Sequence, residues 1–208
     1  MRTIILISLF LCSSFLLHAQ TTGNSAANKW SGIASIYYYF IPGEKIPPTV
    51  TVAADHSSIH IESRYNYEDK NSLSAFVGWN FKKQYNKLDI TVTPMAGILV
   101  GHTNGILPGL ELNATYKRFT LYSENEYMLD FKGKENYFFY SWSELSAQIF
   151  KNTQAGVLAQ SLRWYKTKFD IQRGIYAEYR IGSFTFDAYY FNPFTNSDFA
   201  ILATNFNF

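Results

Sequence analysis

Hydrophobic and polar residues alternate along most of this chain with a period of two. From Ile59 to Tyr67 the odd positions are mostly apolar or aromatic, and every even position is polar. Because successive side chains of a β-strand point to opposite faces, such a segment is predicted to be a strand with one apolar and one polar face. The same alternation runs through residues 73–81, 88–93, 110–116, 175–181 and 184–190.

Short polar or glycine-containing segments separate these runs and are typical of hairpin connections. Together they predict an all-β protein of about twelve strands. The signal is weakest over residues 33–54, which leaves ten strands as an alternative. The expected strands span residues 33–41, 48–54, 57–67, 72–83, 86–101, 105–117, 118–130, 136–150, 154–167, 171–182, 183–193 and 198–208.

The first 19 residues are organised like a secretion signal. Arg2 gives a positive start, residues 4–17 are almost all apolar, and Ala19 ends a small-residue cleavage pattern. The apolar run is shorter than the ~20 residues that a helical membrane span needs. We therefore expect a cleaved signal peptide at residues 1–19, a polar flexible lead-in at 20–31 and a single folded domain at 32–208.

Composition narrows the function classes. The 208 residues include 18 Lys and Arg against 16 Asp and Glu, giving a formal charge of +2. Without a basic excess to neutralise phosphates, a nucleic-acid partner is not expected. The single cysteine, Cys12, lies in the predicted signal peptide, so the exported chain has no disulfide to stabilise it.

Strand length and aromatic residues distinguish a soluble β-sandwich from a membrane barrel. Ten of the twelve predicted strands are at least ten residues long, whereas soluble strands are mostly five or six residues long. A tilted membrane strand needs about 9 to 11 residues. Aromatic groups such as 37–40, 137–140 and 189–191 lie near predicted strand ends, where an interfacial girdle would place them. The chain ends in Phe208, with Leu202, Thr204 and Phe206 at alternate positions before it.

In these features the chain resembles bacterial outer-membrane β-barrel proteins. The resemblance implies a closed antiparallel up-and-down transmembrane β-barrel, inserted into the outer membrane of a Gram-negative bacterium by the barrel-assembly machinery and surrounded by outer-membrane lipids. Closure also pairs every backbone group within the protein, as a lipid environment requires. With both termini in the periplasm, the external connections are all short: 42–47, 68–71, 102–105, 131–135, 168–170 and 194–198.

If the apolar faces meet lipid, the lumen is acidic. It receives eight acidic residues, two arginines and one histidine: His60, Glu62, Arg64, Asp89, Glu111, Glu124, Glu126, Glu144, Glu178, Arg180 and Asp187. An open acidic lumen favours cations. The sequence thus predicts a small porin-like channel for ions or small polar solutes. Its conductance and selectivity are expected to depend on Glu62, Arg64, Glu111, Glu124, Glu126, Glu178 and Arg180.

Two other functions stay open. One is a non-conducting structural or interaction barrel whose lumen charges pair and fill the interior. The lumen-facing glycines Gly97, Gly101, Gly105 and Gly109 fit either backbone coiling or space for a solute.

The other alternative is a lipid-modifying enzyme. The only histidines beyond the signal peptide are His56, His60 and His102, and none has a recognisable serine-hydrolase context. No closely spaced cluster of His, Cys and Asp suggests a metal site. We therefore predict a protein that is not an enzyme, with no catalytic residue, no metal and no cofactor.

Overall fold

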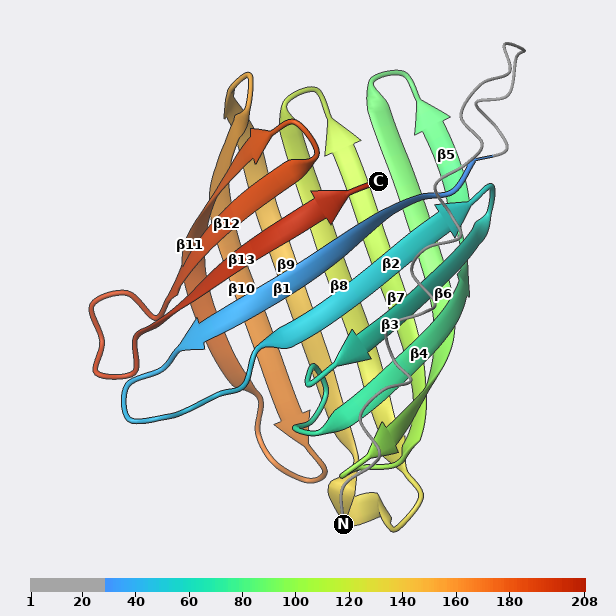
Figure 1. Ribbon diagram of the computed structural model, residues 1–208, viewed down its shortest axis with the longest axis vertical. Helices are drawn as coiled ribbons and strands as arrows, with labels where there is room; N and C mark the ends of the chain where they lie inside the picture. Colours follow the sequence, from blue (N-terminus) through green and yellow to red (C-terminus); the bar gives the residue numbers. More distant parts are fainter. Residues whose placement is uncertain (1–28) are drawn as a thin grey trace, which may run out of the picture.

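The computed structural model describes residues 29–208, which form a closed antiparallel β-barrel (Figure 1). The predicted signal peptide and most of the lead-in lie outside the described residues. No helix among residues 29–208 is long and apolar enough to cross a membrane. The strands are β1 Ser31–Phe40, β2 Thr49–His56, β3 Ile59–Tyr65, β4 Ser72–Trp79, β5 Phe81–Tyr85, β6 Leu88–Gly101, β7 Gly105–Tyr116, β8 Phe119–Asp130, β9 Phe138–Phe150, β10 Thr153–Trp164, β11 Asp170–Ile181, β12 Phe184–Phe191 and β13 Phe199–Asn207.

The strand count confirms the prediction of twelve and excludes ten. β4 and β5 are two parts of one strand, separated at Asn80, and both pair with β6. Residues 33–54, where the pattern is weakest, supply most of β1 and part of β2. The barrel closes because β4 pairs with β6 while β1 lies between β2 and β13 (Figure 1).

The two ends of the barrel differ in their connections. One end, which we call the turn end, has the two-residue turns 57–58, 86–87, 117–118, 151–152 and 182–183. Gly32 and Phe208 exchange two backbone hydrogen bonds there, so both termini of the barrel lie at the turn end. The opposite end, the loop end, has the longer connections 41–48, 66–71, 102–104, 131–137, 165–169 and 192–198.

The outer surface is apolar, as the alternation predicts. On β4, Leu73 is 46% exposed and Val77 is 64% exposed, whereas Ser72 and Ser74 are fully buried. Large exposed hydrophobic residues occur in this way on all thirteen strand segments. Such a continuous apolar belt matches the lipid-facing surface of a transmembrane barrel.

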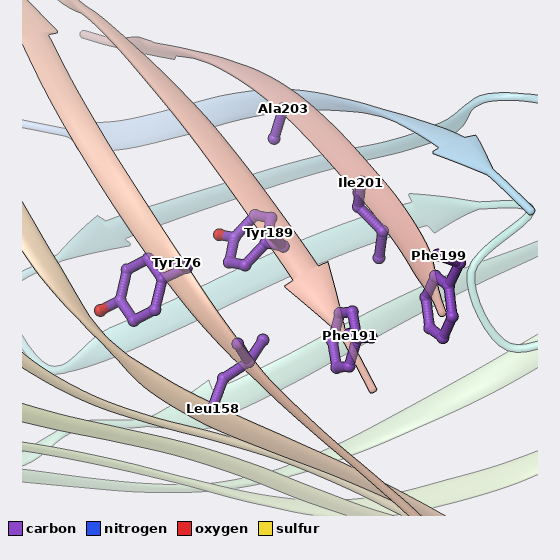
Figure 2. Packing of buried hydrophobic residues seen from close by; sticks show 7 residues of the cluster. All are labelled: Leu158, Tyr176, Tyr189, Phe191, Phe199, Ile201 and Ala203. Atoms are coloured by element: carbon purple, nitrogen blue, oxygen red, sulfur yellow. The ribbon is translucent and has the colours of Figure 1, made fainter. Parts of the chain in front are cut away.

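The interior also contains apolar side chains, some of which the sequence predicts to lie in the outer aromatic girdle. The girdle prediction is wrong for Tyr189 and Phe191, which point inward, because a period of two places every second ring in the lumen. Phe191 stacks on Phe199 with ring centroids 4.7 Å apart. Figure 2 shows their cluster, whose members come from β10 to β13: Leu158, Tyr176, Tyr189, Phe191, Phe199, Ile201 and Ala203.

A second apolar cluster packs inside the barrel against the lumen-facing glycines, and its buried members are Phe76, Met95, Leu99, Leu107, Met128 and Phe138. Phe76 lies directly opposite Gly97 on the neighbouring strand, and a Cβ atom at Gly97 would be 2.5 Å from the Phe76 ring. Met95 covers Gly109 and Met128 covers Gly105 in the same way. The space at these three glycines is therefore taken by large inward side chains rather than left for a solute.

This packing predicts the effect of adding one methyl group. We expect Gly97→Ala to destabilise the barrel by about 1 to 3 kcal/mol, because the buried Phe76 ring must move to admit it. Urea unfolding in lipid vesicles measures the change. Because Leu leaves room for the added methyl group, Gly97→Ala should cost less stability in a Phe76→Leu background than in the natural protein. Ala96→Val on the exposed face should have little effect. Equal stability of Gly97→Ala and the natural protein would contradict this packing.

Candidate functional site: the barrel lumen

Two cavities occupy the lumen. The turn-end cavity has a volume of about 500 Å³ and the loop-end cavity about 550 Å³. Both are lined by Tyr39, Tyr67 and Tyr140, which we call the tyrosine constriction. The Tyr67 and Tyr140 rings meet edge to face, with centroids 5.7 Å apart. The constriction thus separates a cavity near one end of the barrel from a cavity near the other.

A buried guanidinium lies beside the constriction. Arg64 Nη1 donates to Glu124 Oε1 at 2.6 Å and to Glu126 Oε2 at 3.0 Å, while Nη2 donates to Glu62 Oε2 at 2.8 Å. Glu68 Oε1 lies 3.6 Å from Nη1. We call these five residues the arginine cluster. Four carboxylates around one guanidinium give the cluster an excess of acidic groups.

The arginine cluster also positions the constriction. The guanidinium carbon lies 4.6 Å from the centre of the Tyr67 ring and 4.5 Å from that of Phe76. Tyr67 donates its hydroxyl to Glu124 Oε2 at 3.2 Å. Cation–π attraction and this hydrogen bond hold the Tyr67 ring against the cluster.

Four further charged lumen residues lie on the wall formed by β9, β11 and β12. Arg180 and Glu178 on β11 form a loose ion pair at 3.7 Å. Glu144 accepts a hydrogen bond from Trp142 Nε1 at 2.8 Å, and Asp187 accepts one from the Asn205 amide at 2.7 Å. All four charged side chains line the turn-end cavity.

The structure places the seven predicted selectivity residues in three groups. Four join the arginine cluster, Glu111 lines the turn-end cavity near Glu62, and the Glu178–Arg180 pair lies apart on β11. Their roles in conductance and selectivity stay predictions.

The predicted lumen set lacks Asp55 and Glu68, whose carboxylates also point into the barrel. The predicted strand ends at residue 54 and so excludes Asp55, whereas β2 continues to His56 and keeps the alternation. Glu68 lies in a connection that the sequence predicts to be external, but its carboxylate folds inward and accepts a hydrogen bond from Ser74 at 2.7 Å. A period of two extended to residue 55 predicts that Asp55 points inward. No local pattern indicates Glu68.

Asp69, the residue after Glu68, forms a polar contact between two loops. Asp69 accepts hydrogen bonds from Thr103 and from the backbone N–H of Lys70, and it lies 2.7 Å from His102 Nδ1. Partial burial alone would raise the pKa of Asp69, but these bonds hold it below its usual value. Asp69 thereby ties loop 66–71 to loop 102–104 in its ionised form.

Comparison with known proteins identifies the fold. No protein-family profile matches the sequence, and no curated protein sequence matches it. Structures of the KdgM porin, alone and in complex with disordered oligogalacturonate, each have a TM-score of 0.58 at 10% identity, covering 86% of this chain and 99% of that chain. A NanC porin structure has a TM-score of 0.53 at 10% identity with the same coverage. The chain therefore has the fold of small bacterial outer-membrane porins, and these neighbours are porins rather than enzymes.

Proposed function

We propose that this protein is a small porin-like channel of the bacterial outer membrane that passes ions or small polar solutes and prefers cations. The main support is the pair of lumen cavities near opposite ends of the barrel, which share the tyrosine constriction. The porin fold, the apolar belt and the predicted signal peptide agree with this location. Outer-membrane lipids are then the partners of the belt, and the barrel-assembly machinery is the partner during insertion.

The distribution of charge supports a preference for cations. The arginine cluster contains more carboxylates than guanidinium groups, and Glu111, Glu144 and Asp187 add further acidic groups to the turn-end cavity. Low-dielectric walls focus the field of such groups in the lumen. A cation is therefore stabilised there and an anion is repelled.

The acidic field in the lumen also limits the class of solute that can pass. One similar structure is described as binding oligogalacturonate, which is a polyanion. The acidic lumen of this chain would oppose such a ligand. We therefore expect its solutes to be neutral or cationic, so the similarity in fold does not extend to that substrate.

The cation preference can be tested by neutralising two carboxylates. We expect Glu124→Gln with Glu126→Gln to move the reversal potential in a salt gradient towards zero, because two acidic groups beside the constriction are lost. Single channels in planar bilayers give the measurement. Glu135→Gln, an exposed loop substitution, is the control and should leave the potential unchanged. An unaltered reversal potential in the double variant would remove both residues from this role.

A second pair of substitutions separates selectivity from folding, because Glu124 and Glu126 both bind Arg64. Glu144→Gln with Glu178→Gln alters the same cavity without touching the arginine cluster. This variant should also weaken the cation preference. If both double variants fold and keep the natural preference, the acidic lumen does not set selectivity.

The packed interior favours one other candidate, a non-conducting structural barrel. The two apolar clusters and the arginine cluster all lie within the lumen and narrow it. A folded barrel that never conducts in planar bilayers would support this function instead. Discrete conductance steps would exclude it.

A further inference from the structure

Three potential metal ligands meet at the wall of the turn-end cavity. His60 and Glu62 lie on β3 and Glu111 lies on β7, and each offers one ligand atom within 4.8 Å of the others. Strands β4 and β6 separate β3 from β7 in the sheet, so the group forms across the lumen and not along one strand. All three residues line the cavity, which gives an ion a path to them.

The two ring nitrogens of His60 have different surroundings. Nδ1 lies 3.0 Å from Asp55 Oδ1. Nε2 is buried and has no hydrogen-bond partner among residues 29–208, and Glu62 Oε2 lies 3.7 Å from it. His60 as a whole is only 5% exposed. A buried nitrogen without a hydrogen bond is unfavourable, so a ligand that binds Nε2 would stabilise the site.

A chain of hydrogen bonds fixes the orientation of this histidine. Thr93 donates to Asn80 at 2.5 Å, and Asn80 donates to Asp55 Oδ1 at 2.6 Å. Asp55 in turn is placed to accept the Nδ1 proton of His60. When the imidazole is neutral, a carboxylate on one ring nitrogen selects the tautomer in which the other nitrogen carries a free lone pair, as in carboxylate–histidine–metal arrangements.

We propose that His60 Nε2, Glu62 and Glu111 bind a divalent transition-metal ion of the Zn²⁺ type. One imidazole and two carboxylates are donors that suit Zn²⁺. Three protein ligands leave a coordination position directed to the cavity, as in open metal sites. Tyr122 donates to Glu111 Oε1 at 3.3 Å, and Arg64 donates to Glu62 Oε2, so both carboxylates are oriented by neighbours.

Calorimetric titration of the purified, folded protein with ZnCl₂ tests the site without requiring conduction. We expect saturable binding of one ion per chain, with at least a tenfold loss of affinity in His60→Ala. Asp55→Asn should cost about 10- to 100-fold, as expected for a residue that orients a ligand. His102→Ala is the matched control, because His102 also contacts an aspartate but lies in an exposed loop.

Several results would overturn the proposal. They are an absence of saturable binding, equal affinity in His60→Ala and the natural protein, or a loss confined to His102→Ala. An absence of binding would fit a protonated His60 paired with Glu62 instead. If His60→Ala does not fold, Glu111→Gln provides the test, since an amide can keep the bond to Tyr122 while binding metal poorly. Unchanged Zn²⁺ affinity in folded Glu111→Gln would also reject the site.

Discussion

Replacing Arg64 with methionine is expected to destabilise the folded barrel by about 3 to 5 kcal/mol. The guanidinium is fully buried and is the only arginine or lysine group that contacts Glu62, Glu68, Glu124 and Glu126 within the described residues. Its removal leaves these carboxylates crowded together without a counter-charge, which is far more costly than the loss of one surface ion pair. Urea unfolding in lipid vesicles, followed by tryptophan fluorescence, measures the difference.

Two further variants test whether Arg64→Met loses stability because a buried positive charge is removed. Arg180→Met removes an arginine that is 57% exposed and pairs only loosely with Glu178, so it should cost about 0 to 1 kcal/mol. Adding Glu124→Gln and Glu126→Gln to Arg64→Met should restore part of the stability, since fewer buried charges are then left unpaired. Equal unfolding midpoints for Arg64→Met and Arg180→Met would show that the arginine cluster is not a major source of stability.

Alternation alone predicts the fold closely because it is a local property. Each strand of a barrel has one face towards lipid and one towards the lumen, so a period of two reports both the strand and its orientation. The segment 154–167 illustrates the limit of this reasoning. Val157, Leu158 and Ala159 are consecutive apolar residues, and only the structure shows that Leu158 is buried inside while Val157 faces outward.

Alternation predicts which residues point inward, but it does not predict which of them come into contact. The candidate sites depend on those contacts. Arg64 is 60 residues from Glu124 along the chain, and their strands are not neighbours in the sheet. The contact arises from barrel closure and strand tilt. His60 and Glu111 meet for the same reason, which explains why the sequence, with no closely spaced ligands, predicts no metal site.

Aromatic residues show a related limit. Tyr and Trp near strand ends are typical of an interfacial girdle, but the chain places rings on both faces of those strands. Tyr38 is exposed on the outer face, whereas Tyr37 and Tyr39 on the same strand line the lumen. Counting aromatic residues near strand ends therefore overestimates how many belong to the girdle. It also does not predict that some of them form the tyrosine constriction.

Removing two rings of the tyrosine constriction is expected to increase single-channel conductance roughly twofold or more, because the narrowest segment of a pore limits ion flow. The variant is Tyr67→Ala with Tyr140→Ala, since these two rings contact each other edge to face. Conductance steps in planar bilayers give the measurement. Tyr65→Ala is the matched control, because Tyr65 lies two residues from Tyr67 but is 44% exposed on the outer face.

A third variant separates the ring of Tyr67 from its hydroxyl group. Tyr67→Phe removes the bond to Glu124 but keeps the aromatic ring at the constriction, so conductance should stay close to that of the natural protein. If Tyr67→Phe raises conductance as much as the double alanine variant, the hydrogen bond to the arginine cluster closes the pore. If the double alanine variant folds and leaves conductance unchanged, the three tyrosines do not form the limiting segment, and the narrowest part of the lumen lies among the inward apolar side chains.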